Sequence, residues 1–193
     1  MTKVLVIRHG STDWNEARLI QGRTDRALSE AGREQIAAMR LPNEWAGTRC
    51  LASPLQRTMA TGRLLGLDPK PEPRLIEMAW GEWEGKGLND LRAEYTTELA
   101  AKEAMGLDFC PPGGESPRDV QVRLRPLLSE VRAPTIFVTH KGVVRALYSL
   151  ATGWDMTSDP PQKLHNGRAH SFSIASGGTP SVDELNIKLA ASR

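Results

Sequence analysis

Apolar positions along the chain alternate between continuous runs and helical spacing. The continuous runs, at residues 3–7, 49–52 and 135–139, are typical of strands buried on both faces of a sheet. Helical spacing predicts helices over residues 28–39, 54–65, 88–105, 116–131 and 142–150. We also expect an extended segment at 74–78 and two alternating strands, at 169–175 and 185–189, around a turn at 177–180.

Serines mark where several of these helices begin. Ser53 and Ser116 are each followed by a proline, which the first helical turn tolerates, and Ser29 is a further capping residue. The free N–H groups of the helix that begins near Ser53 would favour an anion. Pro126 lies inside the fourth helical stretch, where we expect it to kink or split the helix.

Strands separated by helices predict an α/β fold, a three-layer sandwich in which a mainly parallel central sheet has helices on both faces. The length suits a single domain over residues 1–193 with a small helical insertion at about 85–115. A strand near 170–175 at the edge of the sheet would allow pairing in a homodimer. Ligands of such folds bind beyond the carboxyl ends of the strands, where we expect the chemistry.

Composition narrows the class of protein. Apolar residues make up 39% and charged residues 25% of the chain, which is ordinary for a soluble globular protein. The formal net charge of +2 indicates neither a nucleic-acid nor a membrane partner, and the apolar runs are too short to cross a bilayer. Two cysteines, Cys50 and Cys110, cannot build a disulfide framework, so we expect a cytoplasmic protein.

Two histidines share one sequence context. His9 and His140 each follow a buried apolar strand and precede a glycine within two residues, so both rings should lie at the same edge of the sheet. Arg8 stands beside the first histidine, and Arg57 lies early in a helix. Cations and neutral donors around two imidazoles suit a phosphoryl group, whose transfer depends on positioning and electrostatic stabilisation.

Other kinds of site fit the sequence less well. A strand-end histidine taken alone is more often a hydrogen-bonded core residue, and that alternative stays open. Zinc would need three or four ligands, but no His-x-x-x-His or Cys-x-x-Cys spacing occurs. The Walker phosphate-binding loop and the Gly-x-Ser-x-Gly elbow of serine hydrolases are also absent.

An ordered set of motifs resembles the histidine phosphatase superfamily, also called the phosphoglycerate mutase-like family. The set begins with Arg8-His9-Gly10-Ser11-Thr12-Asp13-Trp14-Asn15 and continues through Gln21–Asp25, Leu28–Gly32, Ala52–Thr58, Leu75–Glu77, Gly81–Gly85, Gly113–Ser116 and Val138–His140. A bare Arg-His-Gly is a weak signal. The ordered set, which spans residues 4 to about 147, is highly specific.

The resemblance implies a role for each matching residue. His9 would be the nucleophile and would become a phosphohistidine, and Glu77 would protonate the leaving oxygen and then activate water. The phosphoryl oxygens would be surrounded by Arg8, Arg57 and His140, with Asn15 as a neutral donor. We also assign Thr12, Gln21, Gly22 and Lys141 to the set of residues that bind the substrate phosphate, although Lys141 departs from the glycine common in the family.

These residue types are consistent with the implied chemistry, which needs no metal and no other cofactor. An imidazole attacks only through an unprotonated nitrogen, and nearby cations keep the ring neutral. An alkoxide leaves poorly, so a carboxylic acid with a raised pKa is useful, and Met78 to Trp80 would supply the desolvation that raises the pKa of Glu77. Glu82 and Glu84 are the alternative acids.

The same site would serve hydrolysis or phosphoglycerate mutation of a small phosphomonoester. Mutases of the family usually have glutamate where Ser11 stands and Gly-Asn where Lys141-Gly142 stands, and they have an arginine pair that residues 86–112 lack. We therefore expect a phosphatase. The alternatives are a cofactor-dependent phosphoglycerate mutase and a catalytically silent module that binds phosphorylated ligands.

Overall fold

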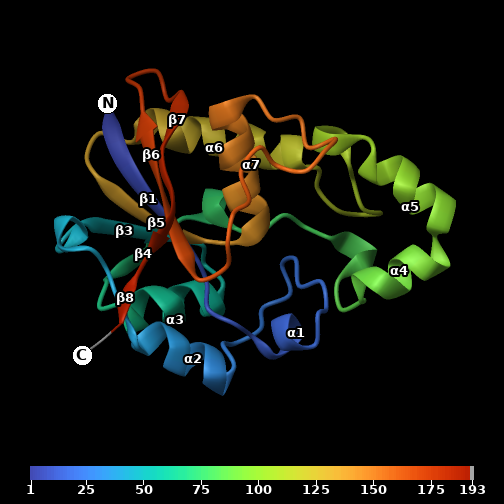
Figure 1. Cartoon of the computed structure of the whole chain (residues 1–193), viewed down its shortest axis with the longest axis horizontal. Helices are drawn as coiled ribbons and strands as arrows, with labels where there is room; N and C mark the ends of the chain where they lie inside the picture. The colour runs from blue at the N-terminus through green and yellow to red at the C-terminus, as the bar shows by residue number, and fades with distance from the viewer. Residues whose placement is uncertain (192–193) are drawn as a thin grey trace.

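The computed structural model describes residues 1–191 and contains a six-stranded sheet in the order β4-β3-β5-β1-β6-β7 (Figure 1). The strands are β1 (Thr2–Arg8), β3 (Arg49–Ala52), β4 (Pro69–Pro71), β5 (Thr135–Thr139), β6 (Arg168–Ile174) and β7 (Pro180–Lys188). β4, β3, β5 and β1 are parallel, whereas β6 and β7 join the sheet antiparallel. The prediction of a mainly parallel central sheet is confirmed.

Helices cover both faces of this sheet, as predicted (Figure 1). α6 (Pro117–Glu130) and α7 (Lys141–Thr152) pack on one face, and α2 (Glu30–Ala37) and α3 (Gln56–Leu64) lie on the other. Alternate residues of each buried strand face the two layers. Val4 and Val6 pack in the core beneath α6 and α7, whereas Leu5 and Ile7 pack in a second core on the opposite face.

The remaining elements are short. They are α1 (Asp13–Glu16), α4 (Leu88–Glu94), α5 (Thr96–Glu103), the strand pair β2 (Met39–Arg40) and β8 (Ala190–Ala191), and four 3₁₀ turns at Asn43–Trp45, Pro73–Leu75, Gly81–Trp83 and Gly106–Asp108. α4 and α5 lie beside the sheet, on the right of Figure 1, within the stretch predicted as a helical insertion. Among the 191 residues with assigned structure, no helix has the length and apolar character needed to cross a bilayer.

The helix predicted over 88–105 is wrong in its continuity. Tyr95 leaves the helical conformation, with φ −117° and ψ 35°, and separates α4 from α5. Its ring packs against Trp83, with the ring centroids 6.4 Å apart, in a small core that also contains Leu91 and Leu99. Packing of the insertion onto Trp83 therefore prevails over the regular helical spacing of its apolar residues.

The extended segment predicted at 74–78 is also wrong. That stretch begins in a 3₁₀ turn, and the strand lies earlier, at β4. β4 contains Pro69 and Pro71, residues that usually argue against a strand. Its place at the outer side of the sheet explains the exception, because an edge strand needs hydrogen bonds along one side only.

Pro126 does not split α6, which runs unbroken from Pro117 to Glu130. The proline removes the N–H that would bind the carbonyl of Val122. Val122 is 63% exposed, so this carbonyl lies on the solvent side of the helix, where water can satisfy it. The helix is not broken at Pro126, because the hydrogen bond that the proline removes lies on the solvent-facing side of α6.

The edge strand expected near 170–175 is an inner strand. β6 pairs with β1 along one side and with β7 along the other. Strand pairing through β6 therefore cannot form a homodimer. Its partner β7 begins at Pro180, earlier than the predicted 185–189, and two register shifts in the β6–β7 ladder interrupt the simple alternation of the sequence there.

Candidate active site

Neighbouring strand ends bring the two histidines together. β1 and β5 are parallel partners in which Arg8 lies opposite Thr139, so His9 and His140 both follow at the carboxyl edge. The His9 N–H donates to the Thr139 carbonyl at 3.0 Å, which extends the ladder by one residue. The two ring centroids are 5.1 Å apart, and the ring planes are inclined by 59°.

His9 is fixed by its own neighbour. Nδ1 lies 2.7 Å from the carbonyl oxygen of Gly10, and because a carbonyl can only accept, Nδ1 carries the proton of a neutral ring. Nε2 is thereby left with its lone pair. The ring is 8% exposed and lines a cleft of about 700 Å³.

His140 lies beneath His9 and has no exposed surface. Its Nε2 is 2.8 Å from the Ser53 hydroxyl, whose oxygen also accepts the N–H of Leu55 at 3.4 Å. If the Ser53 hydroxyl donates to Nε2, the ring proton of His140 resides on Nδ1. That nitrogen has no hydrogen-bond partner among residues 1–191.

Both imidazoles are held in the neutral form. Burial lowers the pKa of His9 well below its usual value, and the positive charges of Arg8 and Arg57 lower it further. The pKa of His140 is also lowered well below its usual value, first by burial and then by the neighbouring His9 and the arginines. A neutral ring with a free lone pair is the form that can act as a nucleophile.

Two arginines supply positive charge at the bottom of the cleft. Arg57 is fully buried, and its terminal nitrogens donate to the carbonyl of Gly22 at 2.7 Å and to that of Thr24 at 2.8 Å. One terminal nitrogen of Arg8 donates to the side-chain oxygen of Asn166. The Nε atom of each arginine is buried without a partner within the described residues, so each keeps a free donor.

The loop that holds Arg57 is itself fixed by Glu84. The carboxylate of Glu84 accepts the N–H groups of Arg23 and Thr24, both at 2.8 Å, and the Thr24 hydroxyl. Burial favours the neutral acid, but these hydrogen bonds outweigh it and lower the pKa of Glu84. Gly22 has φ +52°, and a side chain there would collide with Glu84. Gly22 thus contributes a carbonyl that holds Arg57.

Glu77 lies across the cleft at the beginning of α7. Its Oε1 accepts the N–H of Met78 at 2.9 Å, and its Oε2 accepts that of Gly142 at 3.3 Å. Burial raises the pKa of the carboxyl, while these two hydrogen bonds and the charges of Arg57 and Arg8 act in the opposite direction. A Cβ on Gly142 would lie 2.5 Å from Oε1, so a side chain at this position would displace the carboxyl.

The other predicted phosphate-binding residues divide into two groups. Asn15, Gln21, Gly22 and Lys141 line the cleft. Thr12 does not, because it is fully buried and caps α1, where its hydroxyl accepts a hydrogen bond from the Gln21 amide. The structure therefore gives Thr12 a place behind the cleft wall, where it orients Gln21 and Asn15.

Other charged and aromatic residues near the cleft make structural contacts. Arg23 pairs with Glu115 at 2.6 Å, and Arg26 pairs with Asp13. Glu84 is engaged with the loop described above. Trp83 is a core residue, and Trp80 lines the cleft.

The expected anion site at the beginning of α3 is wrong. The helix begins at Gln56 with Leu55 as its N-cap, two residues later than predicted. The Gln56 N–H, which would have faced an anion, donates to the side chain of Asp25 at 2.9 Å. Ser53 is displaced from the helix end and contacts His140 instead.

Sequence reasoning missed three residues that support the site. Ser53 follows the end of β3, so the rule that ligands gather at carboxyl ends could have identified it. Glu84 was considered only as an acid. Asn166 lies in the loop between α7 and β6, where no sequence pattern indicated that it would contact Arg8.

Comparison with known proteins relates the chain to phosphatases and phosphoglycerate mutases. The sequence profile of the histidine phosphatase superfamily (branch 1) matches residues 4–188. Over 164 residues the chain is 32% identical to glucosyl-3-phosphoglycerate phosphatase of Mycobacterium tuberculosis, covering 75% of this chain and 73% of that protein. Over 218 residues it is 30% identical to the probable phosphoglycerate mutase GpmB of Photorhabdus laumondii, covering 96% and 99% of the two chains.

A longer relative and a solved structure complete the comparison. The chain is 33% identical to the bifunctional protein Rv2228c of Mycobacterium tuberculosis; the match covers 96% of this chain but spans only 54% of that protein's length. The solved structure of mycobacterial glucosyl-3-phosphoglycerate phosphatase in complex with VO3 superposes with a TM-score of 0.79 at 27% identity, covering 97% of this chain and 100% of that chain.

Proposed function

Because the chain belongs to the histidine phosphatase superfamily, branch 1, whose relatives are named as phosphatases and phosphoglycerate mutases, we propose that it hydrolyses a small phosphomonoester through a phosphohistidine on His9. The proposal includes no metal ion. The observation that carries it is the pair of neutral imidazoles 5.1 Å apart, of which His9 lines the same cleft as Arg8, Arg57 and Glu77.

In the first step, the Nε2 lone pair of His9 forms a bond to phosphorus as the bond from phosphorus to the ester oxygen breaks. The leaving oxygen takes the proton of the Glu77 carboxylic acid, so an alcohol departs. The arginines and the Nδ1–H of His140 hold the three remaining phosphoryl oxygens. The Gly10 carbonyl keeps the Nδ1 proton of His9 in place as the ring gains positive charge.

In the second step, the Glu77 carboxylate takes a proton from water. The resulting hydroxide attacks phosphorus, the bond from phosphorus to Nε2 breaks, and His9 recovers its lone pair as inorganic phosphate forms. Burial supports the alternation at Glu77 because it raises the pKa of this carboxyl, while the nearby arginines keep the ionised form accessible.

The experiment that tests the proposal is a phosphatase assay of the wild type and the His9→Ala variant on 4-nitrophenyl phosphate, with and without EDTA. We expect turnover that resists the chelator and a loss of at least about 10³-fold in kcat for His9→Ala, because the nucleophile is gone. Lys70→Ala, at an exposed lysine on the edge strand β4 outside the cleft, is the control.

Full activity in His9→Ala would contradict the mechanism, and loss of wild-type activity in EDTA would contradict its independence of metal. Phosphoenzyme trapped by acid-free quenching should be stable in base and labile in acid, as expected for a bond between phosphorus and nitrogen. A wild type that binds inorganic phosphate but turns over no ester would favour a silent binding module.

The second candidate function is mutation of phosphoglycerate, which the match to GpmB over nearly both full lengths favours. Ser11, Lys141 and the missing arginine pair are the sequence features against it. The discriminating measurement is the rate of 2-phosphoglycerate formation from 3-phosphoglycerate when 2,3-bisphosphoglycerate is present. Formation faster than phosphate release would establish the mutase in place of the phosphatase.

A further inference from the structure

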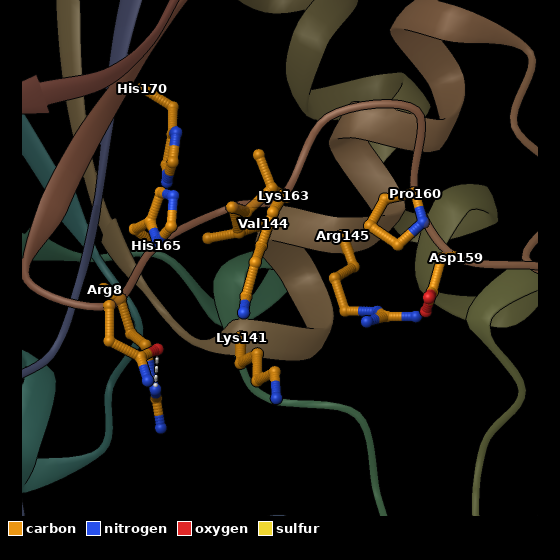
Figure 2. Close-up of a pocket in the computed structure, with 11 residues that line it drawn as sticks. Arg8, Lys141, Val144, Arg145, Asp159, Pro160, Lys163, His165 and His170 are labelled. Atoms are coloured by element: carbon orange, nitrogen blue, oxygen red, sulfur yellow. Dashed lines mark hydrogen bonds between the residues drawn. The ribbon is translucent and has the colours of Figure 1, made fainter.

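A second cavity, of about 390 Å³, opens beside the active-site cleft. It lies between α7 and the loop that joins α7 to β6 (Figure 2). Arg8, Lys141, Arg145 and Asp159 line both the cavity and the cleft, so the two spaces share one wall. A substrate whose phosphoryl group rests at His9 therefore has a route into this cavity, which we call the basic pocket.

The basic pocket carries an excess of positive charge. Lys141, Arg145 and Lys163 join Arg8 around it, and Asp159 is the carboxylate in its lining. Within the described chain, Lys141, Arg145 and Lys163 make no ion pair. Burial and the positive charges of Arg8 and Arg145 lower the pKa of Lys141. An anion in the pocket would relieve this repulsion between cations.

The cation of Arg145 is held in place before any ligand binds. Its guanidinium lies over the ring of Trp154, 4.8 Å from the centroid, and Figure 2 shows its side chain extending toward Asp159. Trp154 is itself buried and anchored, since its indole N–H donates to the Ser158 carbonyl at 3.0 Å. Preorganised donors bind an ion at a lower entropic cost than mobile surface side chains do.

The loop that carries Lys163 is also fixed, by Asn186 of β7. The Asn186 side chain donates to the Lys163 carbonyl at 2.9 Å and accepts the His165 N–H at 2.8 Å. Its backbone N–H donates to Nδ1 of the buried His170 at 3.2 Å. Asn186 has φ +60°, a conformation that asparagine adopts more readily than most residues, and it lies where the β6–β7 register shifts.

From this arrangement we infer that the basic pocket binds a second anionic group of the substrate, through Lys141, Arg145 and Lys163. The inference rests on the proposed function and names its substrate class: a phosphomonoester that carries a carboxylate or a second phosphate on a short carbon chain. The shared chemistry is a second negative charge, placed far enough from phosphorus to reach Lys163 while the phosphoryl group contacts His9.

The test compares substrates that differ in one group. Glycerol 3-phosphate and 3-phosphoglycerate share a three-carbon chain but end in a neutral hydroxymethyl group and a carboxylate, and 1,3-propanediol bisphosphate presents a second phosphate instead. The measured quantity is the ratio of kcat/KM for each two-anion ester to that for glycerol 3-phosphate. We expect the wild type to favour at least one of the two-anion esters, and the favoured ester identifies the anion.

Variants of Lys163 then locate the source of this preference. We expect Lys163→Gln to lower the ratio about tenfold and Lys163→Glu to lower it further, because each removes or reverses a charge that contacts the second anion. The loss should appear mainly in KM. Lys70→Gln is the matched control, because Lys70 is an exposed lysine on β4, at the opposite side of the sheet.

Two outcomes would overturn the inference. One is a wild type with equal kcat/KM for all three esters, and the other is a Lys163→Glu variant with an unchanged ratio. Failure of the proposed function gives a different result, because His9→Ala would then retain its turnover of every ester. If activity depends on His9 but the substrate preference does not depend on Lys163, the proposed role of the basic pocket is wrong and the proposed phosphatase mechanism stands.

Discussion

The reaction centre and the basic pocket are adjacent but built by different means. In the centre, His9, His140 and Ser53 stand at the ends of three neighbouring strands, and the sheet ladder fixes their spacing. In the pocket, Lys163 and Asn166 stand on a loop that side chains hold in place. The centre is a product of regular backbone pairing, whereas the pocket is a product of individual side-chain contacts.

This difference teaches where reactivity and selectivity are encoded. Burial and the charges of the arginines keep both imidazoles of the centre neutral, and burial raises the pKa of Glu77. These effects serve any phosphomonoester. The cations of the pocket act only on a substrate with a second charge. Changes in the centre should therefore alter the rate for all substrates, and changes in the pocket should alter the order of preference.

Among changes that would separate the roles of the reaction centre and the basic pocket, we expect the largest loss of rate from substitution of Glu77. We expect Glu77→Gln to slow hydrolysis of alkyl phosphates by about 10²–10⁴-fold, because their leaving oxygen needs a proton, and to slow 4-nitrophenyl phosphate much less. The alkyl ester rate of the wild type should fall as the pH rises through the raised pKa of Glu77, since the acid form is lost. Steady-state kinetics across pH measures both effects.

Glu82→Gln is the matched control, since it removes the neighbouring candidate acid. An equal loss for good and poor leaving groups in Glu77→Gln would assign Glu77 a role other than proton donor. A large, leaving-group-dependent loss in Glu82→Gln would transfer that role to Glu82.

The next effect concerns the free energy of unfolding and arises from His170, which lines the basic pocket. Burial and the nearby His165 lower the pKa of His170 to about 4, below the ordinary value near 6.5 in the unfolded chain. The unfolded chain therefore binds the proton first, and stability is lost as the pH falls from about 6.5 toward 4. Between about pH 7.5 and pH 5 the loss from this residue is about 2 kcal/mol.

His170→Asn should flatten that pH dependence, because the amide oxygen can accept the Asn186 N–H as Nδ1 does but does not titrate. Urea unfolding of both proteins at the two pH values measures the difference. Parallel curves for wild type and variant would show that His170 does not titrate in this range.

A smaller effect tests the centre at Ser53. We expect Ser53→Ala to lower kcat about tenfold while KM changes less, because loss of one hydroxyl leaves the tautomer of His140 unfixed. The acid limb of the pH profile should also move. Ser181→Ala on the exposed strand β7 is the control, and an unchanged kcat and pH profile in Ser53→Ala would show that the hydroxyl does not orient His140.

The smallest effect tests how the pocket is held. Asn186→Gly keeps the left-handed backbone conformation but removes both amide bonds to the Lys163 loop. We expect the preference for a two-anion ester to fall about threefold and the free energy of unfolding to drop by about 1 kcal/mol. An unchanged preference together with lower stability would show that the loop finds its position without Asn186.

The contrast between the two regions also explains what could be predicted from the sequence. Continuous apolar runs predicted β1, β3 and β5, and the rule on carboxyl ends then placed His9 and His140 together. The catalytic roles came from the family resemblance and remain predictions. Periodicity acts over short stretches, so one sequence contains its signal, and the rule on carboxyl ends needs only the positions of the strands.

The wrong predictions and the residues that were not predicted involve contacts between segments that are distant in the sequence. Tyr95 breaks a helix because its ring packs on Trp83, and Gln56 loses its free N–H because Asp25 reaches it from another loop. Asn166 and Asn186 meet the site from the far end of the chain. No local spacing records which of these partners will be near, so such contacts become visible only when the chain is folded.

The position of β1 and β5 inside the sheet affects how the protein's activity responds to heating. The two imidazoles are separated by roughly the spacing of paired strands, about 4.8 Å, so they can part only if the sheet itself opens. The loop beside them can loosen by breaking a few hydrogen bonds, a much cheaper local event. On warming, we expect discrimination to fade before turnover does, so that the protein accepts a wider range of esters shortly before it melts.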